Sequence, residues 1–115
     1  IASSAHREIQ LMLEEAMRGR VHEWKWEKQG NKNTRVLKGA MGVLDQIMDK
    51  QSLEAEDIVK HLHKLLTEGR LHFMDEDLSK LIISLAKCEV AIQKTAQPRI
   101  ELEKFMMNVA ETSTQ

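Results

Sequence analysis

Apolar residues recur every three to four positions along most of this chain, which is the spacing of one face of an α-helix. A first helix is predicted to start at Ser3 or Ser4, because either side chain can accept hydrogen bonds from the free amides of the first turn. Its apolar stripe comprises Ile9, Met12, Leu13, Ala16 and Met17. The same stripe continues through Val21 and Trp24, so we expect Trp24 to lie in the core.

Three further segments show helical spacing. Thr34 is predicted to cap a helix that follows a loop at residues 30–33, and Pro98 suits the first turn of the last helix. Between them, a helix is expected from about Ser52 to Glu68, with Gly69 at its C-terminus. The expected buried faces are Leu37, Ala40, Met41, Leu44, Ile47 and Met48, then Ala55, Ile58, Val59, Leu62, Leu65 and Leu66, and finally Leu102, Phe105, Met106 and Val109.

The segment from Leu78 to Ile92 is apolar on more than one side. One stripe comprises Leu78, Leu81, Ile82, Leu85, Cys88 and Ile92, and further apolar residues outside it are Ile83, Ala86 and Val90. A helix that is apolar over most of its circumference is usually covered on both flanks. We therefore expect the Leu78–Ile92 helix, capped by Asp75, to be the central helix of the fold.

Signals for β-strands are weak. The chain has no tyrosine, and we recognise no turn-flanked segment that alternates apolar and polar residues over a strand's length. The pattern predicts an all-α fold, a compact bundle of about five helices that forms a single domain over residues 1–115. The chain does not begin with methionine, so we expect a fragment of a longer protein, with frayed ends at residues 1–3 and 111–115.

Composition is that of an ordinary globular domain, with 42% apolar residues, 30% charged residues and a net charge of −1. The longest apolar run, Leu81 to Ala86, is far shorter than the roughly 20 residues of a membrane helix. The first residues do not form a secretory signal, and the single cysteine, Cys88, excludes an internal disulfide. We therefore expect an intracellular protein, cytoplasmic or nuclear, that is neither secreted nor transmembrane.

No motif for catalysis or for cofactor binding is present. Gly39 and Gly42 form no phosphate-binding cluster, and close packing against a neighbouring helix explains them better. His61 and His63 are two positions apart, so they cannot share a helical face as metal ligands. Cys88 lies on an apolar stripe, which favours a small core residue over a reactive thiol. We expect a protein that is not an enzyme and that binds no cofactor or metal.

Positive charge is concentrated in one part of the chain. From Arg18 to Lys38 the balance is about +5, and over the other residues it is about −6. Both tryptophans lie in this basic run. Helix positions two apart differ by about 200°, so the helical prediction places Trp26 opposite Trp24, where its ring either anchors a partner or folds over a lysine stem. The run itself is a solvated face, a receptor for an acidic protein segment, or a contact for nucleic-acid phosphates with Trp26 stacked on a base.

The residues 71–74 form the most apolar of the predicted loops. They are either a buried tether between two helices or a patch that faces a partner. Phe73 and Met74 are therefore a second candidate contact.

These observations predict a non-enzymatic helical adaptor that binds another protein through a basic and aromatic surface or through a groove between helices. Its expected ligand is a short segment with acidic and apolar residues. The expected contact residues are Trp26, Lys25, Lys28, Lys32, Arg35, Lys38, Phe73 and Met74. One alternative is a nucleic-acid-binding domain, associated with transcription or chromatin, that uses the same basic run. Another is a structural piece of a larger assembly, and the sequence does not indicate an oligomeric state. Glu23 and Glu27 are interleaved with the basic residues and favour a protein partner over phosphate.

Overall fold

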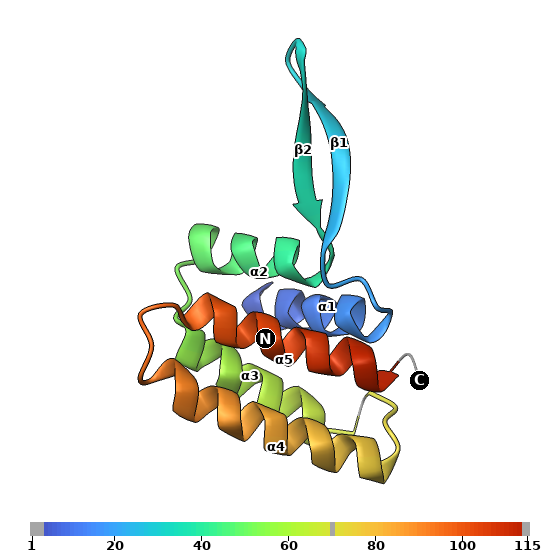
Figure 1. The fold of residues 1–115 in the computed structure, drawn as a ribbon, viewed down its shortest axis with the longest axis vertical. Helices are drawn as coiled ribbons and strands as arrows, with labels where there is room; N and C mark the ends of the chain where they lie inside the picture. Colours follow the sequence, from blue (N-terminus) through green and yellow to red (C-terminus); the bar gives the residue numbers. More distant parts are fainter. Residues whose placement is uncertain (1–3, 70, 114–115) are drawn as a thin grey trace.

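A computed structural model describes residues 4–69 and 71–113, which form five helices and one two-stranded antiparallel sheet. The helices pack into one body, and the strands form a hairpin that stands out from it along the long axis of the molecule (Figure 1). The prediction of about five helices is confirmed, and the prediction of a purely all-α fold is wrong. The elements are α1 (Ser4–Met17), β1 (Glu23–Gln29), β2 (Lys32–Lys38), α2 (Gly39–Lys50), α3 (Ala55–Thr67), α4 (Asp75–Ile92) and α5 (Pro98–Ser113).

One hydrophobic core joins the five helices. The apolar stripes predicted for α3 and α5 are buried in full, and most of the α1 stripe is buried with them. Helix α1 packs against α2, α3 and α5, so the N-terminal helix lies inside the body. The spacing of apolar residues therefore identifies the core face of these helices correctly.

Helix α4 is not the central helix, contrary to the prediction. It packs against α3 and α5 and lies on the outer side of the body, at the end of the molecule away from the hairpin (Figure 1). Ile83 is 56% exposed and Val90 is 52% exposed, because no helix of the described chain covers the second apolar side of α4. Helix α5 contacts each of the other four helices, and its Phe105 is fully buried, so α5 is the central element.

The hairpin, which we call the arm, begins where α1 ends. Gly19 has a φ of +81°, a left-handed conformation that ends α1 after Met17 instead of letting it continue to Trp24. The arm reverses at Gly30 and Asn31, since Gln29 pairs with Lys32 across a two-residue turn. Gly30 has a φ of +64° at the first central position, as type II′ hairpin turns require. The loop predicted at residues 30–33 is therefore shorter, and its second half belongs to β2.

The base of the arm is held by backbone hydrogen bonds. The amide of Ala40 donates to the carbonyl of Arg20 at 2.8 Å, and the amide of Met41 donates to that of Val21 at 3.0 Å. A Cβ atom on Gly39 would lie 2.5 Å from the carbonyl oxygen of Arg20. The close packing expected at Gly39 and Gly42 is confirmed, but their neighbours are backbone atoms at the base of the arm rather than another helix.

Several predicted helix ends differ from the structure. Helix α2 begins at Gly39 rather than after Thr34, because Thr34 and Leu37 belong to β2. Helix α3 begins at Ala55 rather than near Ser52, and Asp75 is the first residue of α4 rather than its cap. Helix α5 continues to Ser113, so residues 111–113 are helical rather than frayed. Residues 1–3 and 114–115, and with them the predicted cap at Ser3, lie outside the described residues.

Candidate functional site

The two tryptophans lie on the same face of the arm. Side chains two apart on a β-strand point to the same side, so Trp24 and Trp26 of β1 are neighbours. Trp24 is 54% exposed and Trp26 is 70% exposed. The prediction that Trp24 lies in the core and opposite Trp26 is therefore wrong, because it assumed a helical period. The register adds three residues of β2, and we call the whole set the aromatic face: Trp24, Trp26, Lys28, Asn33, Arg35 and Leu37.

The opposite face of the arm carries all of its carboxylates. Glu23 lies 3.2 Å from the Lys25 ammonium, and Glu27 lies 2.6 Å from the Lys38 ammonium. Glu23, Glu27 and Lys38 also line a shallow pocket together with residues of α2. We call this side the paired face; its residues are Glu23, Lys25, Glu27, Gln29, Lys32, Thr34, Val36 and Lys38. Leu37, at the base of the aromatic face, lines the same pocket.

The aromatic face combines indole rings with positive charge. The guanidinium of Arg35 lies 4.7 Å from the centre of the Trp24 ring, a cation–π contact worth about 0.5–1 kcal/mol at an exposed site. Lys28 is exposed on the same face, two residues after Trp26 on β1. Within the arm, this face has two cations and no carboxylate. It can attract an anionic partner and bury an aromatic surface against it.

The two exposed tryptophans do not stabilise the fold by burial in its core. A hairpin of two strands is marginally stable by itself in water. Among the described residues, the backbone hydrogen bonds between the arm and the body lie at the base of the arm. Leu37 is half-buried and packs against the core, whereas the two indoles do not contribute to that core. Large exposed apolar groups rimmed by polar ones mark interaction sites.

The predicted contact residues fall on three separate surfaces. Trp26, Lys28 and Arg35 lie on the aromatic face, as part of one site. The other three lysines of the prediction lie on the paired face: Lys25, Lys32 and Lys38.

Phe73 and Met74 precede α4, at the opposite end of the molecule from the arm (Figure 1). Phe73 packs against the core, as a buried tether would, while Met74 is 74% exposed. They do not form a common surface with the arm. Trp24, which the sequence reasoning assigned to the core, belongs to the site instead. The alternation of Trp24 and Trp26 with charged residues ahead of Gly30 and Asn31 is the sequence signal that could have found the arm.

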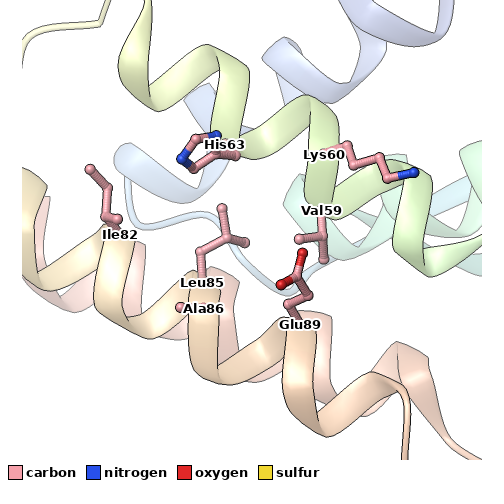
Figure 2. A pocket seen from close by; sticks show the side chains of 7 residues that line it. All are labelled: Val59, Lys60, His63, Ile82, Leu85, Ala86 and Glu89. Carbon is pink, nitrogen blue, oxygen red and sulfur yellow. The ribbon is translucent and has the colours of Figure 1, made fainter.

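A second recess lies between α3 and α4. It has a volume of about 420 Å³, and Ile82 and Leu85 project from α4 toward α3 within it (Figure 2). Its other lining residues are Val59, Lys60, His63, Ala86 and Glu89. None of the predicted contact residues lines this groove, and its mixed charges favour no particular ligand.

The cysteine and the clustered histidines of the described residues form no metal site. Cys88 is buried, as expected, and this burial, followed by the nearby Glu101 carboxylate, raises the pKa of its thiol to about 11. A thiol with so high a pKa is a weak nucleophile near neutral pH. His6 and His61 approach with their Nδ1 atoms 3.4 Å apart, but among residues 4–69 and 71–113 no three His, Cys, Asp or Glu side chains could hold a metal ion. No described helix combines the length and apolar character that a membrane crossing requires.

Comparison of the chain with protein-family models, with curated proteins and with solved structures finds no match in any of the three. The arm is therefore the feature from which a function is inferred.

The tryptophan emission of the native protein is expected to be that of water-exposed indole. Trp24 and Trp26 are the only tryptophans, and the chain has no tyrosine, so the signal reports on the aromatic face alone. Acrylamide should quench the native protein nearly as well as the unfolded one. Arg35→Ala should increase the quenching further, because it uncovers the Trp24 ring. A native emission that is strongly blue-shifted and protected from acrylamide would contradict the exposed arm.

Proposed function

We propose that this chain is a non-enzymatic binding module whose arm docks a segment of another protein on its aromatic face. One observation carries the proposal: the only two tryptophans of the chain lie side by side on an exposed face that has two cations and no carboxylate of the arm. Tryptophan and arginine are the residues that most often dominate the binding energy of protein interfaces.

Charge indicates the chemistry of the partner segment. The arm carries a net charge of +3, while the whole chain carries −1, so the arm is a positive projection from an acidic body. Such a field accelerates the approach of an acidic partner and orients it toward the arm. The indoles then supply the apolar contact area. We therefore assign the ligand to segments that combine acidic and apolar residues.

Two charge reversals on β2 test the proposal, because they differ in face but not in charge. Arg35→Glu lies on the aromatic face and Lys32→Glu lies on the paired face, and both positions are exposed. Proteins captured from an extract of the source cells by the wild-type protein should be lost with Arg35→Glu and retained with Lys32→Glu. Trp26→Ala should weaken binding of the same proteins by about 30-fold, which corresponds to a hot spot of about 2 kcal/mol.

One result of this experiment would contradict the proposal. If both charge variants and Trp26→Ala capture the same proteins as the wild type, the aromatic face is not the binding site. Far-ultraviolet circular dichroism should show an unchanged fold for all three variants, because each replaces an exposed side chain.

Binding of single-stranded nucleic acid is a second candidate, supported by the placement of the glutamates. In sequence, Glu23 and Glu27 interrupt the basic run, but in the arm they lie on the paired face and neutralise Lys25 and Lys38 there. Bases could then stack on the indoles while Lys28 and Arg35 contact phosphates. With two such contacts, the logarithm of the affinity for oligo(dT) should fall with the logarithm of salt at a slope of about −1.4. Absence of tryptophan quenching by oligo(dT) at low salt would exclude this candidate.

A further inference from the structure

The outer edge of β1 is free for pairing along the described arm. The sheet has two strands, and no described element lies along the side of β1 that faces away from β2 (Figure 1). In a hairpin closed by a two-residue turn, the residues that flank the turn form a hydrogen-bonded pair, here Gln29 and Lys32. Hydrogen-bonded and non-hydrogen-bonded pairs alternate along an antiparallel ladder. The backbone N–H and C=O groups of Trp24, Trp26 and Lys28 therefore point outward, away from β2.

Of the devices that shield exposed edge strands, this edge has charged residues but no proline, bulge or covering element along the described β1. Natural edge strands are shielded by charged residues, prolines, bulges or a covering element. Two of the three outward-directed residues of β1 are tryptophans, and the strand contains no proline. A strand of suitable sequence can pair with it.

The sequence of β1 is complementary to itself in one antiparallel register. If Trp26 lies opposite the partner's Trp26, then Lys25 lies opposite the partner's Glu27, and Trp24 lies opposite the partner's Lys28. The two-fold axis repeats each of these pairs. The seam then has two Lys–Glu pairs on the paired face, and one Trp–Trp contact flanked by two Trp–Lys contacts on the aromatic face. Opposite charges and aromatic pairs across strands are both stabilising.

The two nearest registers are unfavourable, and a register shifted by four residues, which sets Lys25 opposite the partner's Glu23, pairs only residues 23–25 of β1. Shifts by an even number of residues keep the outward-directed backbone groups in contact, and the smallest are shifts of two. One such shift places Glu27 opposite the partner's Glu27, and the other places Lys25 opposite the partner's Lys25. Like charges directly opposite each other destabilise a sheet.

We infer that two copies of this chain associate through the outer edges of β1, in antiparallel register about Trp26, and form a four-stranded sheet. The helical bodies then lie at opposite ends of this sheet, because the two arms run in opposite directions. The aromatic faces become continuous, with four tryptophans on one side. The inference goes beyond the proposed function, since it concerns self-association through the backbone edge of β1. The side chains of Trp24, Trp26 and Lys28 on the aromatic face flank the seam. Edge pairing of two short strands buries less area than a standard interface, so the dimer is weak and depends on concentration.

Charge reversal across the seam gives a test with purified protein. Lys25→Glu and Glu27→Lys are each expected to weaken dimerisation by roughly tenfold, because each variant places like charges opposite each other twice. A mixture of the two variants should dimerise as the wild type does, since the introduced carboxylate of one chain then faces the introduced ammonium of the other. Sedimentation equilibrium over a range of concentrations measures each association constant.

Two controls keep the inference falsifiable. Lys32→Glu makes the same charge change as Lys25→Glu but lies on β2, so its dimer should match the wild type. Hydrogen exchange should slow at the amides of Trp24 and Trp26 as concentration rises, whereas the amide of Arg35 on the outer edge of β2 should not change. A wild-type protein that stays monomeric at the highest concentration overturns the inference. A dimer that Lys25→Glu and Glu27→Lys leave intact, or that their mixture fails to restore, overturns it as well.

Discussion

Replacement of Phe105 by alanine is expected to lower the free energy of unfolding by about 3–5 kcal/mol, because it opens a cavity at the centre of the helical body. Phe105 is 1% exposed and lies on α5, which contacts every other helix. The loss is a large share of the roughly 5–15 kcal/mol that stabilises a typical domain. Urea unfolding should be followed by far-ultraviolet circular dichroism. Tryptophan emission is unsuitable, since both indoles are already exposed in the folded protein.

The matched control for this prediction is Ile83→Ala on α4. Ile83 is 56% exposed, so its truncation should change the free energy of unfolding by no more than about 0.5 kcal/mol. If α4 were the central helix, as its apolar residues suggest, Ile83→Ala would cost about 2–5 kcal/mol. Equal losses for the two variants would therefore place α4 inside the fold and contradict the structure.

Gly39→Ala is expected to destabilise the protein by about 2–5 kcal/mol, from two effects that add. Gly39 has a φ of +77°, a left-handed conformation that costs any residue with a Cβ atom about 1–2 kcal/mol. Its new methyl group would also lie 2.5 Å from the carbonyl oxygen of Arg20, so the backbone at the base of the arm must move. This movement strains the hydrogen bond from Ala40 to Arg20.

Gly30→Ala separates these two effects. Gly30 also has a positive φ, +64°, but no atom lies within 4 Å of the position its Cβ would take. This variant should lose only the conformational part, about 1–2 kcal/mol. If Gly39→Ala costs no more than Gly30→Ala, the base of the arm is looser than the structure shows.

Helix α3 shows how much of the body could be predicted. Its six expected core residues are all buried, because one stripe of large apolar side chains alternates with charged residues on a single helix. A helix with one such stripe can bury its apolar side chains in only one orientation. The same reasoning succeeds for α5 and for most of α1. It misplaces α4, whose apolar residues occupy more than one side, since the pattern does not show which sides have neighbours within the same chain.

The arm was missed because its sequence satisfies a helical pattern by accident. Val21 and Trp24 continue the spacing of Leu13 and Met17, and the spacing of apolar residues does not show that Gly19 ends the helix. A strand is usually recognised by one apolar face that is buried. In the arm both faces are exposed over most of their length, and the alternation therefore carries no burial signal.

The candidate site depended on this one assignment. A period of 3.6 residues separates Trp24 from Trp26, while a period of two brings them together and moves Lys25 to the other side. The residue types of the site were predicted from the sequence, but their grouping was not. The same assignment changes the position of the Glu23 and Glu27 carboxylates. They are next to the tryptophans in sequence but lie on the opposite face of the arm.

Local pattern alone was sufficient to establish the mostly helical body, its core residues and the concentration of aromatic and positive residues between residues 18 and 38, because these properties depend on spacing along the chain. Tertiary structure decided which helix is central, where the chain leaves the body as an arm, and which side chains share a face. These depend on contacts between residues far apart in sequence, such as the hydrogen bonds from Ala40 and Met41 to Arg20 and Val21, and on strand register. The pattern of residues within one segment contains no information about long-range contacts or about strand register.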